Sequence, residues 1–407
     1  MTSGVTEIDA GVVEQAAQYL ADPSTRRNPY AFYDLVREVA PVLQTPSGVW
    51  LISGYAEAGE ILRTDEVLSR RAAGLKHAIV DDPEAKLIFT SRMLYNDRPE
   101  HTRLRRLVSY AFTRGGVAAW EERITRVTHA KLDELVPRGH MDLSADFCYP
   151  IVEQIITELL GVRAGDLPLF IRWSTAMTEP PPGGDRDSYR EAANTATREI
   201  TAYVRERIAE RRDAPGDDIL SKLIAAEDSD GRLAEHEVVA LTMELIFAGH
   251  ETTSNFVANG MLCLLHRPDQ LRMLQADRSL LPSAINEMLR FESPAPMPMP
   301  RVALADFEIG GQWIRAGDTI VVLLAAANRD PQVFTDPDVF DIRRTPNDYI
   351  SFGFGAHYCL GQQLARLESG VMFTALLDRL PGMTLAGKAI WSDHQFFRSL
   401  SSLPVAW

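Results

Sequence analysis

The chain has 407 residues, of which 45% are hydrophobic and 24% are charged, which is the composition of an ordinary globular protein with a large core. The formal net charge of −14 argues against a general binder of nucleic acids or anionic membranes. The cysteines Cys148, Cys263 and Cys359 lie far apart and form no CxxC pair, so we expect a reducing, cytoplasmic setting without disulfides.

The N-terminal part carries no targeting pattern. Residues 1–20 contain Glu7, Asp9 and Glu14 but neither a basic start nor an apolar centre, so a signal peptide or a membrane anchor is not expected. We expect residues 1–27 to be a partly ordered extension and residues 28–407 to form a single domain. Within the domain, residues 28–40 predict a helix, 41–53 a β-hairpin and 55–63 a short helix. Residues 70–99 predict a long loop with a short helical piece.

A basic segment begins the next predicted helix. His101 and Arg105 are four residues apart, so they share one helix face and could hold an anion together. The alternative is a solvated basic face. Residues 116–213 that follow are mostly helical in pattern.

Residues 233–265 predict one long helix, which at ~1.5 Å per residue would span roughly 45 Å. Charged and amide side chains interrupt it, so it is a central core helix rather than a transmembrane one. Its middle reads Ala248-Gly249-His250-Glu251-Thr252-Thr253. A glycine costs about 1 kcal/mol inside a helix, and a buried carboxylate costs more unless it is paired, so this misfit indicates function. The alternative is a satisfied kink in a core helix, since the Thr252 hydroxyl can bond to a backbone carbonyl.

Later segments add charges and prolines. Glu287 and Arg290 lie at i and i+3 on another predicted helix and face each other, although any helix can carry such a pair. Residues 294–301 are rich in proline and cannot be helical. Residues 307–314 and 318–325 predict strands.

The most informative stretch is residues 352–361, Phe-Gly-Phe-Gly-Ala-His-Tyr-Cys-Leu-Gly, because a helical pattern begins directly behind it. Cys359 would lie at the positive end of that helix, which lowers a thiol pKa and favours the thiolate, a soft ligand for iron. Gly355 and Gly361 would let a flat group approach the backbone. The alternative is a buried cysteine that acts as a small hydrophobic residue.

Together these segments resemble the cytochromes P-450, the heme-thiolate monooxygenases, in their soluble bacterial form. The resemblance rests on four motifs in family order: His-x-x-x-Arg at 101–105, Ala-Gly-x-Glu-Thr-Thr at 248–253, Glu-x-x-Arg at 287–290 and Phe-x-x-Gly-x-His-x-Cys-x-Gly at 352–361. It implies a mainly α fold with small β-sheets (α+β), in which a long central helix lies over a heme and the cysteine loop lies beneath it.

The resemblance also implies roles for single residues. Cys359 would bind the iron of heme b (iron protoporphyrin IX), Thr252 would hydrogen-bond dioxygen and Glu251 would deliver protons. The residues around the heme would be His101, Arg105, Arg301 and His357 at its propionates, with Phe352 and Gly361 near the thiolate.

Two further groups of residues follow from the same resemblance. A buried charge network would lock the cysteine loop onto the core through Glu287, Arg290 and Arg344, with Arg343 as the fallback. The substrate pocket would include Ala248, Gly249, Ala295, Pro296, Met297 and Leu400.

The implied activity is insertion of one atom of O2 into a hydrophobic small molecule, by hydroxylation or epoxidation of a secondary metabolite such as a polyketide or peptide. The chain carries no flavin or nicotinamide fingerprint, so electrons derived from NAD(P)H would come from a ferredoxin and its reductase, docked near Arg103, Arg106 and Arg366. We expect a monomer with neither a nucleic-acid nor a membrane partner. The alternatives are a peroxide-using heme-thiolate enzyme, a non-catalytic heme sensor and a metal-free helical binding protein.

Overall fold

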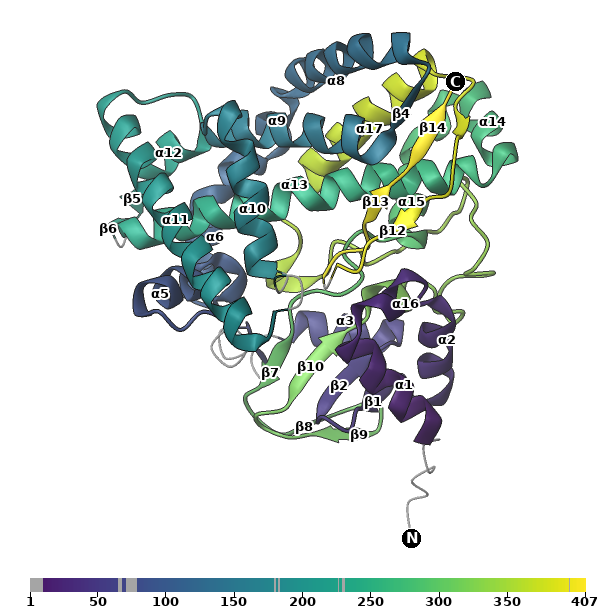
Figure 1. Ribbon diagram of the computed structural model, residues 1–407. Helices are drawn as coiled ribbons and strands as arrows, with labels where there is room; N and C mark the ends of the chain where they lie inside the picture. Colours follow the sequence, from purple (N-terminus) through teal and green to yellow (C-terminus); the bar gives the residue numbers. More distant parts are fainter. Residues whose placement is uncertain are drawn as a thin grey trace.

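The computed structural model describes residues 10–64, 68–70, 79–178, 181, 184–225, 227–228, 231–394 and 396–407. Helices dominate one part of the molecule, and a small sheet with its own helices forms the other part (Figure 1). This is the mainly α fold with small sheets that the sequence predicts. None of the helices in the described ranges is both long enough and apolar enough to cross a membrane.

The helical part is arranged around α13, Glu235–Leu265, which covers nearly the range predicted for the long helix. α13 packs against helices that precede it in the sequence and against helices that follow it, because most of its residues are apolar around the whole circumference of the helix. The helices of this part are α5 (Pro83–Ser91), α6 (Glu100–Ser109), α7 (Arg114–Ala118), α8 (Glu121–Leu135), α9 (Tyr149–Leu160), α10 (Leu167–Thr178), α11 (Arg186–Asp213), α12 (Ile219–Ala225), α14 (Pro268–Ala276), α15 (Leu281–Phe291) and α17 (Gln362–Arg379).

The sheet part contains five strands in the order β1-β2-β10-β7-β3. β1 and β2 form the predicted hairpin, and Gly48 takes a positive φ of 79° in its turn. β2 pairs with β10 in parallel and the other neighbours pair antiparallel. The strands of this sheet are β1 (Val42–Gln44), β2 (Val49–Ile52), β3 (Leu68–Ser69), β7 (Arg301–Ala303) and β10 (Thr319–Val322).

Short helices cover this sheet. They are α1 (Ala10–Ala21), α2 (Tyr30–Val39), α3 (Tyr55–Arg63) and α16 (Leu324–Ala327). Val12 and Ala16 of α1 are buried, and the Tyr19 and Tyr33 hydroxyls lie 2.7 Å apart. Residues 10–27 of the expected extension are therefore packed onto the domain, and residues 1–9 lie outside the described residues.

Smaller sheets complete the fold. The single strand predicted over 307–314 is wrong, because Gly310 and Gly311 take positive φ values and turn the chain into a hairpin of β8 (Phe307–Ile309) and β9 (Gln312–Ile314). The remaining pairings are β11 (Thr384–Leu385) with β14 (Pro404–Ala406), β14 with β4 (His140–Asp142), β12 (Ile390–Trp391) with β13 (Leu400–Ser402), and β5 (Glu227–Asp228) with β6 (Gly231–Arg232).

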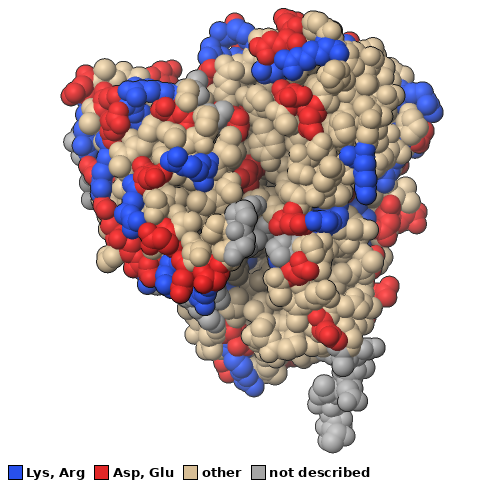
Figure 2. All heavy atoms as spheres, in the orientation of Figure 1, with Lys and Arg blue, Asp and Glu red and all other residues tan. Residues whose placement is uncertain are grey.

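Acidic and basic side chains are interspersed over the helices on the left of the surface view (Figure 2). Cross-helix ion pairs account for part of this pattern, such as Arg205 of α11 with Glu84 of α5 at 2.7 Å. Both partners are about half exposed, so each such pair contributes at most about 1 kcal/mol.

Candidate functional site

The cysteine loop is closed by its own backbone. The Cys359 N–H donates to the Phe352 carbonyl at 2.9 Å, and Gly353 and Gly355 take positive φ values of 70° and 72°. A Cβ at Gly355 would lie 2.5 Å from the carbonyl oxygen of Leu62, so this glycine lets the loop pack on α3. A Cβ at Gly361 would meet nothing within 4 Å, and the approach of a flat group to this backbone stays a prediction.

The thiol of Cys359 differs from its predicted state. Burial raises the pKa of Cys359, and the N–H groups of Gly361 and Gln362 and the charge of Arg105 offset only part of that rise. The position at the start of a helix is therefore not enough to ionise the Cys359 thiol. The loss of solvation on burial raises its pKa more than the nearby N–H groups lower it. A bound metal ion supplies the missing positive charge and deprotonates a coordinating thiol.

Arginine and histidine side chains from three segments gather beside this loop. His101 and Arg105 come from α6, Arg301 from β7 and His357 from the loop, and the rings of His101 and His357 lie 4.1 Å apart. Arg105 donates to the carbonyls of Ala356 at 3.0 Å and Tyr358 at 2.7 Å. The sequence predicts one anion held by His101 and Arg105, whereas here Arg105 also clamps the loop backbone.

Arg70 is a member of this cluster that sequence reasoning missed. It is 4% exposed, and its backbone N–H donates to Asp97 at 2.9 Å. Burial, and then the charges of Arg105 and Arg70, lower the pKa of His101 to about 4. Burial, and then Arg70 and His101, also lower the pKa of His357. The concentration of positive charge therefore suits a bound anion with more than one negative charge.

The middle of α13 is accessible, although the helix is otherwise a core helix. Residues 238–246 and 253–264 are buried, but Ala248 is exposed and Thr252 is partly exposed one turn later on the same face. The Thr252 hydroxyl donates to the Ala248 carbonyl at 2.8 Å, the bond that the sequence predicts for it. Gly249 faces elsewhere, because a Cβ there would come within 2.7 Å of Ile156 on α9, so its missing side chain serves helix packing.

Glu251 lies in a polar cluster next to this accessible face. Its Oε1 accepts a hydrogen bond from Ser174 of α10 at 3.2 Å and lies 3.6 Å from His250 Nε2. Its Oε2 lies 3.4 Å from Nε2 of His394, which comes from the segment between β12 and β13. Sequence reasoning assigned no role to Ser174 or His394, since neither lies in a motif.

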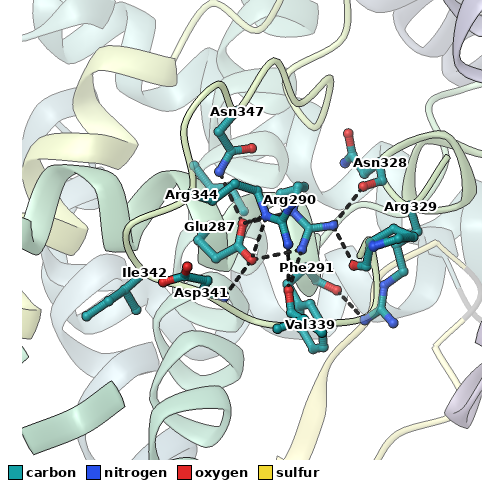
Figure 3. Close-up of polar contacts among 12 residues, drawn as sticks. Glu287, Arg290, Phe291, Asn328, Arg329, Val339, Asp341, Ile342, Arg344 and Asn347 are labelled. Atoms are coloured by element: carbon teal, nitrogen blue, oxygen red, sulfur yellow. Dashed lines mark hydrogen bonds and ion pairs between the residues drawn. The ribbon is translucent and has the colours of Figure 1, made fainter. Parts of the chain in front are cut away.

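A buried charge network holds the cysteine loop to α15 (Figure 3). Glu287 and Arg290 are 0% exposed and form two hydrogen bonds of 2.8 Å, and Arg344 Nε donates to Glu287 at 3.2 Å. Of the two candidates, Arg344 is the one brought to Glu287, whereas Arg343 is 58% exposed and pairs with Asp341.

Asn328 connects this network to the cysteine loop, and sequence reasoning assigned it no role. Arg290 donates to the Asn328 carbonyl at 3.0 Å, and the Asn328 side chain accepts from the Ile350 N–H at 2.7 Å and donates to Ser351 at 2.8 Å. The Ser351 hydroxyl in turn donates to the Leu289 carbonyl of α15 at 2.6 Å. The start of the loop is thus fixed to the core at two consecutive residues.

The remaining predicted pocket residues lie on two segments, and Pro296 lines one cavity together with His394 and Phe397. Pro296 is buried and its carbonyl accepts from the Ala325 N–H at 3.1 Å, Ala295 is partly buried, and Met297 packs on the cluster around α1 and α2. Leu400 is 2% exposed within β13, where its carbonyl accepts from Ser144 at 3.1 Å. Their contact with a substrate stays a prediction, and the segment beside Glu251 is the one around His394.

These residues fit heme b. Cys359 offers a single sulfur ligand, the cationic cluster suits two carboxylates, and the accessible turn of α13 leaves space beside Ala248 and Thr252. Among the described residues, the buried His101 Nε2 has no hydrogen-bond partner, which a carboxylate oxygen would provide.

Comparison with known proteins places the chain among related sequences. The family model described as Cytochrome P450 matches residues 42–382. Cytochrome P450 monooxygenase PikC of Streptomyces venezuelae is 37% identical over 100% of this chain and 95% of its own length. The structure of P450BioI in complex with acyl carrier protein ligated by hexadec-9Z-enoic acid is similar with a TM-score of 0.87 and 35% identity, covering 94% of this chain and 99% of that one. The bacillaene polyketide synthase cytochrome P450 PksS of Bacillus subtilis 168 follows with a TM-score of 0.85 and 35% identity, covering 94% and 97%.

Proposed function

Because the chain belongs to the cytochrome P450 family, we propose that it inserts one atom of O2 into a hydrophobic secondary metabolite such as a polyketide or peptide. The enzyme is a heme b monooxygenase that takes its electrons from partner proteins. The single observation that carries the proposal is the loop that presents Cys359 beside a cluster of three arginines and two histidines, together with an accessible turn in a core helix.

The chain's own residues bind and orient the cofactor. Cys359 would provide the sulfur ligand to the iron, and the N–H groups of Gly361 and Gln362 would stabilise that sulfur. Arg70, Arg105 and Arg301 would neutralise the two propionates, His101 and His357 would donate hydrogen bonds to them, and Phe352 would lie near the thiolate. When bound, the heme supplies the activation of O2.

On the opposite side, two α13 residues manage protons. Glu251 gives a proton toward the site, and the Thr252 hydroxyl, which lies next to it on the accessible turn, accepts and donates hydrogen bonds there. Ala248, exposed one turn earlier, leaves room for the substrate. These roles rest on the position of the two side chains at the accessible turn between the buried stretches 238–246 and 253–264 of α13.

For the electron donor we propose a ferredoxin and its reductase. A small acidic ferredoxin fits basic side chains on the cysteine side of the molecule, where Arg106 is exposed and Arg366 lies over the Phe352 ring at 5.6 Å. Arg103 is the weakest of the three candidates, because it pairs with Glu237 of α13. Charge reversal at Arg106 therefore provides the sharper probe of docking.

The substrate class draws support from the relatives. One similar structure is a polyketide-synthase cytochrome P450 by its own title, and another holds a fatty acyl group on a carrier protein. Partly buried apolar side chains at Ala295 and Met297 suit a large apolar molecule as well.

The proposed function is tested with purified protein, a bacterial ferredoxin, its reductase, NADPH and 18O2 over a panel of polyketides and peptides. The expected result is a substrate-induced shift of the heme spectrum for at least one compound, and a product that contains one labelled oxygen atom. Product formed with peroxide but never with O2 and reductant would instead support the peroxide-using alternative. A panel of apolar compounds that produces neither shift nor product would contradict the substrate class.

Replacement of Thr252 by alanine is expected to separate electron use from product formation. The substitution removes the hydroxyl at the accessible turn but keeps a good helix former, so α13 remains intact. Since positioned proton donors contribute about 10²–10⁴-fold, we expect product per NADPH to fall at least roughly tenfold while peroxide release rises. Thr242, whose hydroxyl makes the same bond to the carbonyl four residues back in the buried part of α13, provides the control. Thr242→Ala that lost coupling equally would refute the role of Thr252.

A further inference from the structure

Glu251 is flanked by two histidines from different parts of the chain, and the proposed proton delivery uses neither of them. His250 is its neighbour on α13, and His394 comes from the C-terminal segment. The side chains are well buried, with 12% of Glu251, 5% of His250 and 10% of His394 exposed. Their protonation is therefore set by contacts with the protein.

Backbone groups fix the protonation of His394. Its Nδ1 accepts hydrogen bonds from the N–H groups of Phe396 at 3.0 Å and Phe397 at 3.1 Å, so Nδ1 carries no proton. The proton of the neutral ring is then on Nε2, which faces Glu251 Oε2 at 3.4 Å. Burial, and then the charge of Arg26 and the proximity of His250, lower the pKa of His394 to about 4, which keeps the ring neutral.

His250 has the opposite arrangement. Its Nδ1 lies 3.1 Å from the Ile246 carbonyl, which can only accept, so Nδ1 carries the proton. Nε2 of the neutral ring then carries no proton, and its lone pair faces Glu251 Oε1, which lies 3.6 Å away. Burial lowers the pKa of His250, which disfavours a second proton on the ring.

A lone pair that faces an ionised carboxylate is repelled, whereas one that faces a protonated carboxyl is a hydrogen-bond acceptor. The separation of 3.6 Å is longer than a hydrogen bond, so a small rotation or one bridging water completes the contact. The nearby Tyr149 hydroxyl does not compete, because it donates to Asn255 at 3.1 Å. Among the described side chains, His250 offers the carboxyl an acceptor, and Ser174 and His394 offer it donors.

We propose that His250 is a positioning residue that holds Glu251 in its protonated form, and that His394 and Ser174 stabilise the carboxylate left after the proton departs. This inference rests on the proposed role of Glu251 in proton delivery. In the step itself, the O–H bond of Glu251 breaks, its electron pair stays on the carboxylate, and the proton moves toward the Thr252 side of the site. A proton from solvent then forms a new O–H bond on Glu251, so both histidines end as they began and no electron is exchanged.

The first test reads protonation directly in the holoenzyme in its reduced, carbon-monoxide-bound state, without turnover. Nitrogen-15 NMR is expected to show His250 protonated at Nδ1 and bare at Nε2, and His394 the reverse, with signals assigned through single histidine variants. Infrared difference spectra against Glu251→Gln are expected to show the C=O band of a protonated carboxyl, and that band shifts or disappears in His250→Phe. A proton on His250 Nε2, or a carboxyl C=O band that is unchanged in His250→Phe, would overturn the inference.

The second test measures product per NADPH. His250→Phe and His394→Phe are each expected to lower it by about tenfold, below the range for complete loss of a proton donor because Glu251 remains. His394→Gln recovers most of the loss, since its amide again offers an N–H group, and His266→Phe, at the exposed end of the same helix, provides the control. Unchanged coupling in both phenylalanine variants would refute the inference. The spectroscopic measurements of the first test require no turnover. If the protein oxidised no substrate, the proposed function would be contradicted, and the first test alone would decide this inference.

Discussion

Replacing Cys359 by alanine is expected to abolish the carbon-monoxide absorbance that is characteristic of a thiolate-bound heme, and with it all monooxygenase product. Alanine keeps the Cβ and the loop backbone but removes the sulfur, which the N–H groups of Gly361 and Gln362 hold in place. The only other cysteines, Cys148 and Cys263, are buried elsewhere in the core and cannot replace it. The measurement is the reduced, carbon-monoxide difference spectrum, normalised to the heme content of each preparation.

The matched control for this variant is Cys148→Ala. Cys148 is 0% exposed, and burial raises the pKa of its thiol well above the ordinary value, so it behaves as an apolar core side chain. Its replacement should cost some stability but leave the spectrum unchanged. If Cys359→Ala kept the absorbance, another residue would be the iron ligand and the proposed function would lose its basis.

Replacing Glu287 by glutamine is expected to lower the free energy of unfolding by ~3–5 kcal/mol, the usual cost of removing one partner of a buried ion pair. Glutamine has nearly the same volume, so the loss does not come from a cavity. It leaves Arg290, which is 0% exposed, without its compensating charge, and it also weakens the contacts to Arg344 and Asn347. Urea denaturation with far-ultraviolet circular dichroism measures the change.

The network also predicts where the damage appears first. Because Asn328 and Ser351 connect Arg290 to the start of the cysteine loop, the thiolate absorbance should disappear at lower urea concentration than the helical signal. Asp306→Asn provides the control, since the Asp306–Arg315 pair is 48% and 63% exposed and should contribute little to stability. Equal losses in the two variants would show that the buried network has no special role.

Local patterns explain the predictions that agree with the structure. The long central helix and the first hairpin follow from side-chain periodicity and turn residues, which act over a few neighbouring positions. The cysteine loop is similar, because its glycines and the helix behind it occupy consecutive residues. The hairpin at Gly310 and Gly311 was missed because a pair of glycines was read as part of a continuous strand.

Burial explains the predictions that differ. A helix start was expected to lower the pKa of Cys359, but the pKa is raised, since the extent of desolvation is unknown until the loop is packed. Gly249 and Gly355 were linked to a ligand, yet each faces a packed neighbour, Ile156 or Leu62, from a remote part of the chain. What surrounds a residue cannot be read from its position in a motif.

The amino-acid sequence by itself determined the family, the cysteine that we propose as the heme ligand, the long helix that carries Glu251 and Thr252, and the charged pair of Glu287 and Arg290. Each of these features depends on residues that are close together in the chain. Only the tertiary structure decided that Arg70 joins the cationic cluster, that Asn328 reaches the cysteine loop and that His394 faces Glu251. These residues are brought together by the packing of distant segments, and their protonation then depends on the burial that this packing creates.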